Sequence, residues 1–343
     1  MPFTKYTNLD FDQIKTSIKD YLRANSTFTD FDFEGSNFSV LIDTLAYNTY
    51  ITAFNSNMIV NESFLDSATL RENVISLAGN IGYVPRSRTA SAARISFDVT
   101  TTVNTPTLTL KAGVVCTGRA NDALYTFAIP EDTTANTVSG PADSNGNPTF
   151  IASFDNINVF QGIFLTKQFL YDGSLDQRFV LNNSFIDTST IKVYIGKQNT
   201  RGIEYSLSEN IFDIDKNSRI FFLNEVQDEK YELRFGDGII GKKLGEDGDG
   251  TYITVDYIVT DGRNGNGASN FSFSGTLESA NTQIIDPGTV TITTNQSSIN
   301  GGEIEPIDSI KYYAPRLYSS QYRAVTARDY EAIIQNIYPN TES

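Results

Sequence analysis

Hydrophobic positions near the N-terminus have the spacing of amphipathic helices. After Asp10 they recur every three or four residues over several turns, and Asp10 and Gln13 stand at the spacing of a capping box. A second helix is predicted to begin at Ser36 and a third shortly after Thr69. We therefore expect residues 1–88 to form a helical N-terminal region.

The second and third predicted helices carry different boundary signals. Thr69 and Glu72 again have the spacing of a capping box, and Gly79 and Gly82 are expected to end the third helix. The second helix is marked mainly by its apolar residues. Its predicted contact stripe consists of Phe38, Leu41, Ile42, Leu45, Thr49, Thr52 and Ala53.

From Ala93 onward the pattern changes to the two-residue alternation of half-buried strands, for example around Phe97 and Phe235. A polar stretch at 131–149, which contains Gly and Pro, is expected to be a surface loop. We therefore predict that residues 89–300 form one or more β-rich domains.

The last segment, residues 301–343, returns to helical spacing. One helix is predicted after Pro306, with an interruption at Ala314-Pro315-Arg316, and another is predicted from Thr326. The predicted fold class is α+β, with a helical N-terminal region, a β-rich middle and a helical C-terminal segment.

Two phosphate-binding patterns, G-x-G-x-x-G and G-x-x-x-x-G-K, overlap in one segment, Phe235-Gly236-Asp237-Gly238-Ile239-Ile240-Gly241-Lys242-Lys243. Both patterns require a following helix, because the phosphate binds the N–H groups at its N-terminus. Three glycines follow within nine residues and disfavour a helix, and Lys243 stands where a Ser or Thr ligand of Mg²⁺ is required. We therefore predict no nucleotide site and interpret these glycines as the corner of a β-hairpin whose second strand starts at Thr251.

Composition removes several classes of chemistry. The chain has no histidine and one cysteine, so Ser-His-Asp units, Cys-His units and His/Cys zinc sites are excluded within it. Cys116 is expected to be a small buried residue of a strand. The formal net charge of −15 argues against a nucleic-acid partner. No apolar run approaches the roughly 18 residues that span a bilayer, so no membrane partner is expected.

Carboxylate-based sites are weakly supported. Asp213, Asp215 and Asn217 copy the first positions of a calcium loop, but the glycine and the final glutamate of that loop are missing. Asp247 and Asp249 are another possible pair for a hard cation. No two carboxylates are singled out for glycoside hydrolysis, and the chain has no tryptophan for stacking on sugars. We predict no catalytic residue, no metal and no cofactor.

Candidate protein-contact residues fall into two groups. Tyr and Asn side chains gather on the second predicted helix, and Arg and Tyr side chains, among them Tyr312, Tyr318 and Arg328, gather in the C-terminal segment. Aromatic residues and arginine are enriched at protein interfaces. For the first group, packing between the N-terminal helices alone remains an alternative. The candidates are Tyr47, Asn48, Tyr50, Phe54, Arg71, Arg316, Tyr322, Arg323 and Tyr330.

Four segments in this order resemble one known family, the baseplate J-like proteins of contractile-tailed bacteriophages, and within it the T4-type wedge proteins of the inner ring. They are the stretches 33–50, 64–86, 235–241 and 301–330. The third contains Phe-Gly-Asp-Gly-Ile-Ile-Gly, and the fourth contains Ala-Pro-Arg and Arg-Ala-Val-Thr. The resemblance extends from about residue 30 to residue 335.

This resemblance implies a structural, non-enzymatic role in the tail baseplate of a virion that is assembled in the host bacterial cytoplasm. The implied partners are a second copy of the chain, other baseplate wedge subunits, and neighbouring wedges, hub or sheath-initiating proteins. Such proteins form dimers and inter-wedge contacts in a ring that changes diameter when the tail contracts. Family members are usually longer, so this chain is expected to be the N-terminal half of a member or a truncated member.

A different class of function remains open from composition. The strand-rich middle and the abundance of Thr, Asn and Gly also suit a β-rich tail adhesin or a glycan-binding or glycan-degrading protein. Glycan binding or saccharide release would favour that alternative.

Overall fold

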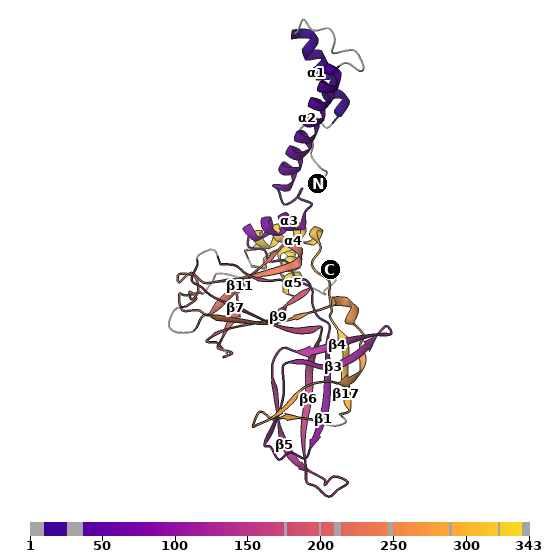
Figure 1. Ribbon diagram of the computed structural model, residues 1–343, viewed down its shortest axis with the longest axis vertical. Helices are drawn as coiled ribbons and strands as arrows, with labels where there is room; N and C mark the ends of the chain where they lie inside the picture. The colour runs from indigo at the N-terminus through magenta and orange to yellow at the C-terminus, as the bar shows by residue number, and fades with distance from the viewer. Residues whose placement is uncertain are drawn as a thin grey trace. The chain divides into compact units, whose positions relative to one another are not determined.

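The computed structural model describes residues 10–25, 37–174, 177–198, 200–208, 214–245, 250–287, 290–321 and 323–337. These residues form two compact units. A helical unit combines parts of Met1–Tyr83 with Pro306–Ile337, and a β unit lies within Val84–Glu305 (Figure 1). The predicted α+β class, with helices before and after a β-rich middle, is confirmed.

The first two helices, α1 (Phe11–Asn25) and α2 (Asn37–Glu62), lie side by side as an antiparallel pair (Figure 1). The capping residue predicted before α1 is confirmed, because Asp10 Oδ1 accepts the N–H of Gln13 at 3.1 Å. An ion pair of 2.5 Å between Lys15 Nζ and Asp43 Oδ1 ties α1 to α2. The predicted start of the second helix at Ser36 lies outside the described residues.

Helix α3 (Arg71–Asn80) is capped by a residue of α2 instead of by its own sequence. Residue 70 is the N-cap and makes no side-chain cap bond, so the predicted capping box of Thr69 and Glu72 is wrong. Glu62, the last residue of α2, accepts the N–H groups of Thr69 and Leu70 at 2.8 and 3.2 Å. A carboxylate that arrives from another helix thus satisfies N–H groups at this end of α3.

Helices α4 (Ile307–Ser320) and α5 (Ala327–Ile337) pack with α3 around a small core. Its buried members are Ala68, Val74, Ile75, Ala78, Tyr83, Ile310, Ala314 and Leu317. The predicted interruption at Ala314-Pro315-Arg316 is wrong, because α4 continues through Pro315. Burial of residues on both sides of the proline holds the helix together. The Arg316 side chain also donates to the carbonyl of Tyr312, near the place where Pro315 lacks an N–H.

The start of α5 predicted at Thr326 is confirmed, and the structure shows that it has the form of a capping box with Asp in place of Glu. The Asp329 carboxylate accepts the N–H of Thr326 at 2.7 Å, and the Asp329 N–H donates to Thr326 Oγ1 at 3.3 Å. Both ends of the box are therefore satisfied locally, which fixes where α5 begins.

Within the described residues of the β unit, the strands form two mostly antiparallel sheets. In the larger sheet, β14-β3-β4-β6-β5-β2-β15-β16 follow one another, and β1 pairs with both β6 and β17. Its strands are β1 (Ala92–Thr101), β2 (Thr107–Leu110), β3 (Gly113–Ala120), β4 (Ala123–Ile129), β5 (Thr133–Gly140), β6 (Thr149–Gln161), β14 (Ser269–Phe273), β15 (Leu277–Ser279), β16 (Ile284–Ile285) and β17 (Ile292–Ile299).

Aromatic pairs fill the core of the larger sheet. The rings of Phe97 and Phe154 stack at 5.0 Å, and those of Phe127 and Phe271 meet edge to face at 5.0 Å. Cys116 is buried in β3 as predicted, and burial raises the pKa of its thiol to about 12. The prediction of a loop over 131–149 is wrong for residues 133–140, because β5 pairs with β2 and β6 there, whereas residues 141–148 contain no strand. Polar Thr-rich strands of this kind pair well when one face stays exposed.

The smaller sheet has the order β7-β13-β9-β10-β11-β12-β8. Its strands are β7 (Ile163–Leu170), β8 (Phe179–Leu181), β9 (Ile186–Gly196), β10 (Ile203–Leu207), β11 (Ile220–Val226), β12 (Lys230–Phe235) and β13 (Tyr252–Val259). The predicted hairpin between the strands at 235 and 251 is wrong, because β9, β10 and β11 lie between β13 and β12. The alternation of apolar and polar residues correctly predicted that both segments are strands. Which strands they pair with depends on residues distant in the sequence.

The glycine segment after β12 folds back on itself as a closed loop. Asp237 Oδ1 accepts the N–H groups of Ile239 and Ile240 at 2.8 and 2.9 Å, and the Gly238 N–H donates to the Gly241 carbonyl at 3.1 Å. These backbone bonds lower the pKa of the Asp237 carboxyl. No helix follows in the described residues up to Gly245 or from 250 to β13, so this loop lacks the setting of a phosphate-binding motif.

Hydrogen bonds of buried polar residues join the two sheets. Gln161 at the end of β6 accepts from Thr260 Oγ1 at 2.6 Å and donates to Asp261 at 2.9 Å, just beyond β13. Asp187 at the start of β9 accepts the N–H of Ala90, just before β1, at 2.8 Å. Buried polar groups with partners on both sides of a junction fix its geometry, because breaking them would leave unsatisfied groups in the interior.

The Glu62 cap predicts how the helical unit responds to acid. Burial alone raises the pKa of this carboxyl, but the hydrogen bonds from Thr69, Asn73 and Leu70 outweigh it and lower the pKa from 4.5 to about 2. A lowered folded-state pKa contributes stability above the unfolded value, and that contribution is lost as pH falls from about 4.5 to about 2. We expect Glu62→Gln to reduce the fall of the melting temperature between pH 4.5 and about pH 2, measured by circular dichroism.

Glu72→Gln is the matched control for this test. It removes one carboxyl from the first turn of α3 and leaves the Glu62 cap in place. Its melting temperature should therefore fall with pH as steeply as that of the unchanged protein. Equal acid sensitivity of Glu62→Gln and the unchanged protein would contradict the proposed cap.

The closed glycine loop predicts a steric penalty at Gly236. A Cβ at this position would lie 2.3 Å from the backbone carbon of Gly241. We expect Gly236→Ala to reduce the free energy of unfolding by about 2–3 kcal/mol, measured by calorimetry. At Gly302 an added Cβ would lie 3.9 Å from its nearest neighbour, so Gly302→Ala should change stability by less than about 0.5 kcal/mol. Equal melting behaviour of the two variants would refute the clash.

Candidate interaction surfaces

The face of α2 that is buried within this chain is narrow. Its buried residues recur mostly every three or four positions and include small and polar side chains. They are Ser39, Ile42, Ala46, Asn57 and Asn61. Of the stripe predicted from the sequence, only Ile42 belongs to this face, so that prediction is wrong. Apolar residues occupy several faces of α2, and periodicity alone did not identify the face that packs.

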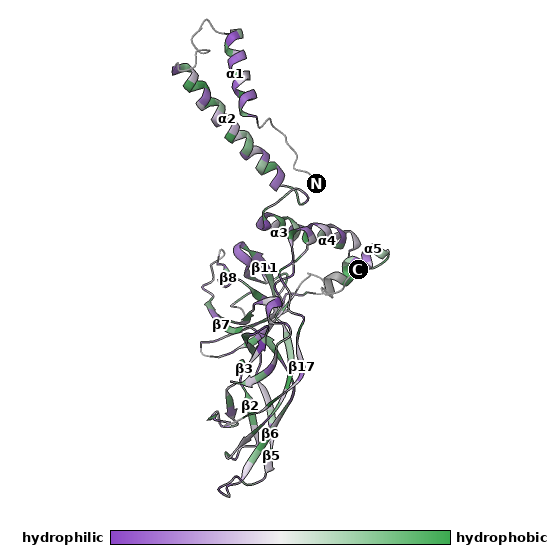
Figure 2. Ribbon diagram, turned by 90° about the vertical axis from the view of Figure 1, so that its right-hand side faces the viewer, coloured by the Kyte–Doolittle hydropathy of each residue, from purple (hydrophilic) through white to green (hydrophobic). Residues whose placement is uncertain are grey.

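A second apolar stripe on α2 is exposed. Val40, Tyr47, Ile51, Phe54 and Met58 follow helical spacing, with Thr44 completing the row, and Tyr47 and Phe54 are 60% and 46% exposed. Figure 2 shows hydrophobic positions along the whole length of α2. We call the exposed apolar residues of this helix the α2 apolar surface. Its members are Phe38, Val40, Leu41, Leu45, Tyr47, Ile51, Phe54, Met58 and Ile59.

The polar residues of α2 do little to hydrate this surface. The helix carries no charged residue between Asp43 and Glu62. Several hydroxyl groups donate back to the carbonyl one turn earlier, as Thr44 does to Val40 and Thr52 does to Asn48, at 2.9 and 2.8 Å. A hydroxyl that bonds its own helix donates no hydrogen to water. Exposed helices usually place charged residues on the side facing solvent, so this helix has the character of one that is covered by protein.

The structure separates the residues that were predicted together on this helix. Tyr47, Asn48 and Phe54 are exposed, whereas Tyr50 is half-buried. Arg71, the first residue of α3, is also partly buried. The one-turn spacing of Tyr47, Tyr50 and Phe54 could not show this, because the direction of a helix face is set by the neighbour it packs on.

A second surface lies on α4 and the start of α5. Arg316 stacks over the ring of Tyr312, with its guanidinium carbon 3.4 Å from the ring centroid. Arg316 and Arg328 line a surface cavity of about 350 Å³ together with Pro315, Ser319, Thr326 and Asp329. The predicted residues Arg323 and Tyr330 are exposed on these elements, and Tyr322 lies outside the described residues.

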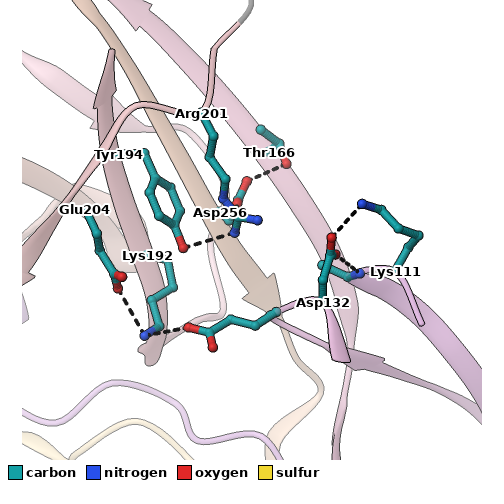
Figure 3. Close-up of polar contacts among 10 residues, drawn as sticks. Lys111, Asp132, Thr166, Lys192, Tyr194, Arg201, Glu204 and Asp256 are labelled. Carbon is teal, nitrogen blue, oxygen red and sulfur yellow. Dashed lines mark hydrogen bonds and ion pairs between the residues drawn. The ribbon is translucent and has the colours of Figure 1, made fainter. Parts of the chain in front are cut away.

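A charged cluster in the β unit gave no signal in the sequence (Figure 3). Lys192 of β9 pairs with Glu131 at 2.8 Å and with Glu204 at 3.2 Å, which links the smaller sheet to the segment after β4. Nearby, Lys111 pairs with Asp132 at 2.5 Å. The hydrogen bond to Glu131 raises the pKa of Lys192.

A cation–π contact extends this cluster. Arg201 lies 4.3 Å from the ring centroid of Tyr194 and pairs with Asp256 at 3.3 Å, and Asp256 also accepts from Thr166. Each charged residue drawn in Figure 3 has an opposite charge as its neighbour. Charges that are all engaged in ion pairs suit a structural link between sheets better than acid–base work.

Other candidate sites receive no support from the geometry. Asp215 accepts hydrogen bonds from Asn217 and Ser218 in a tight turn, and Asp213, Asp247 and Asp249 lie outside the described residues. Within the described ranges, no three acidic, His or Cys side chains gather to hold a metal ion. None of the described helices is long and apolar enough to cross a bilayer.

The N-terminal helical region matches a known protein family. Residues 10–83 match the family model for the helical domain of gp6-like baseplate wedge proteins. Over 340 residues the chain is 28% identical to the baseplate wedge protein gp6 of Enterobacteria phage T4. The alignment covers 94% of this chain and 49% of that protein, so the chain spans about half the length of this relative.

The comparison with solved structures gives a weaker match than the comparison of sequences. The match is to a chain of the anti-feeding prophage baseplate, determined by cryo-EM, with 12% identity and a TM-score of 0.29. The match covers 98% of this chain and 66% of that chain. The family model and the phage T4 relative confirm the resemblance drawn from the sequence, and this chain is similar to the gp6-like baseplate wedge proteins.

Proposed function

We propose that this chain is a structural subunit of a contractile phage tail baseplate wedge and acts through protein–protein contacts without a catalytic site. The phage T4 relative is named as a baseplate wedge protein, and the match to the gp6-like helical domain covers α1, α2 and α3. The role places the protein in the tail baseplate of a virion, after assembly in the cytoplasm of the host bacterium.

The α2 apolar surface is the observation that carries this proposal. Covering an exposed aliphatic or aromatic side chain contributes roughly 1 kcal/mol or more, depending on how much area is removed from water. The surface contains nine such side chains along one helix. That is enough to drive association once partners are positioned, even after the loss of translational and rotational freedom.

Helices from partner subunits fit this surface best. Many of its residues are three or four positions apart, which is the spacing of side chains at helix–helix contacts. A second copy of the chain would bring the same uncharged face, and a helix of another wedge subunit would complete a bundle. In this arrangement the helical unit forms the dimer and wedge contacts, while neighbouring wedges, hub or sheath-initiating proteins meet other surfaces of the chain.

Ring formation and its change on contraction require contacts that break and re-form. We assign the permanent contacts to the α2 apolar surface, because large apolar interfaces are typical of obligate complexes. Exposed polar and charged surfaces, such as that of α4 and α5, suit the contacts between wedges that rearrange.

The proposal predicts that Tyr47 is an anchor of assembly. Truncation of a central aromatic anchor costs about 2 kcal/mol or more, so Tyr47→Ala should weaken association with the other wedge subunits about 30-fold. The assembly midpoint is measured by light scattering on a concentration series of purified subunits.

Leu124→Ala is the matched control, because Leu124 is 64% exposed on β4 and Tyr47 is 60% exposed on α2. Its assembly midpoint should not change. An unchanged midpoint for Tyr47→Ala would remove Tyr47 from the interface. A chain that stays monomeric with all wedge subunits present would overturn the proposed function itself.

A further inference from the structure

The cavity between α4 and the start of α5 lies in a basic part of an otherwise acidic chain. The full sequence has a formal net charge of −15, but residues 307–337 contain four Lys or Arg residues and three Asp or Glu residues. Arg316 and Arg328 stand on the wall of the cavity, and Arg323 lies in the connection between the two helices. This part of the surface is therefore locally basic.

Arg316 is held in a fixed position. Its guanidinium lies over the Tyr312 ring, and Nη1 donates to the Tyr312 carbonyl at 2.5 Å. Stacking and this hydrogen bond orient the planar group while leaving its other donors available. An arginine that is already ordered loses less side-chain entropy when it binds an anion.

The arginines of the cavity have no carboxylate partner among the described residues. No ion pair joins Arg316, Arg323 or Arg328 to an acidic side chain, whereas Arg178 pairs with Glu232 at 2.5 Å and Arg88 pairs with Glu303 at 2.7 Å. Asp329 also lines the cavity, but its carboxylate accepts the N–H groups of Val325 and Thr326 at the start of α5. That local cap satisfies the helix N-terminus, so the arginines are the groups left to attract an anion.

The exposed residues around the cavity have the composition of a protein-contact surface. Tyr318 is 64% exposed, and Tyr312 and Tyr330 on the same two helices are exposed as well. Arginine and tyrosine are the residues that most often anchor interfaces. Their presence on the same two helices as these guanidinium groups favours a protein segment over a free small anion.

We propose that this cavity binds an Asp or Glu side chain from an acidic segment of a partner protein, with Arg316 as the fixed anchor and Arg328 as the second cation. A carboxylate matches the fork of a guanidinium with two parallel hydrogen bonds. The negative charge of Asp329 in the wall disfavours a doubly charged phosphate more than a singly charged carboxylate. This inference deepens the proposed function, on which it rests for the protein nature of the partner.

Binding of a labelled hexaglutamate peptide tests this site on the full chain, with hexaglutamine as the uncharged peptide. Fluorescence anisotropy should show binding of hexaglutamate alone, weaker at higher salt. Arg316→Ala and Arg328→Ala should each lower the affinity about tenfold. Arg316→Lys should give an intermediate loss, because lysine keeps the charge but lacks the fork and the stacking. Arg119→Ala, which removes an exposed arginine of β3 in the β unit, should leave binding unchanged.

Several outcomes would overturn the proposal. Failure of hexaglutamate to bind at any salt concentration would do so, as would equal binding by all variants including Arg119→Ala. Tighter binding of a phosphorylated peptide or of single-stranded RNA, lost in the same two variants, would assign the site to phosphate instead. Tyr47→Ala should bind hexaglutamate normally, so a failure of this site and a failure of the α2 interface give different results.

Discussion

An α-helix that is apolar around most of its circumference needs protein on more than one side, and α2 has this property. In this chain α2 packs on α1, and its buried face contains small and polar residues such as Ser39, Asn57 and Asn61. The larger apolar residues point elsewhere and stay exposed. The helical region therefore presents an apolar surface on which the proposed contacts with other subunits rest.

The β unit has the opposite character. Its sheets bury closely packed aromatic and aliphatic cores, and the polar groups at their junction, such as Gln161 and Asp187, have hydrogen-bond partners. The ion pairs of Lys192 with Glu131 and Glu204 link the sheets. A well-packed β unit and a helical unit with exposed apolar residues are consistent with the structural role proposed above.

The glycine segment 235–241 shows how far a motif can be interpreted without structure. Rejecting a phosphate site required only the residues that follow it, because glycines and Lys243 exclude the helix and the metal ligand that such a site needs. Its interpretation as a hairpin corner was wrong, since a turn sequence does not say which strands it joins. The structure shows a closed loop in which the Gly241 backbone leaves no room for a side chain at Gly236, while Gly241 itself has a φ of +79°, a conformation that favours glycine.

The sequence by itself determined the fold class, the capping of α1, the start of α5, most strands and the resemblance to baseplate wedge proteins, because these depend on local spacing and on ordered motifs. Only the tertiary structure decided the rest. It showed which face of α2 packs, how Glu62 caps α3, why α4 passes through Pro315, how β12 and β13 are separated, and that Arg316 and Arg328 share a cavity. Each of these features depends on contacts between residues that are distant in the chain. Local sequence patterns do not predict such contacts.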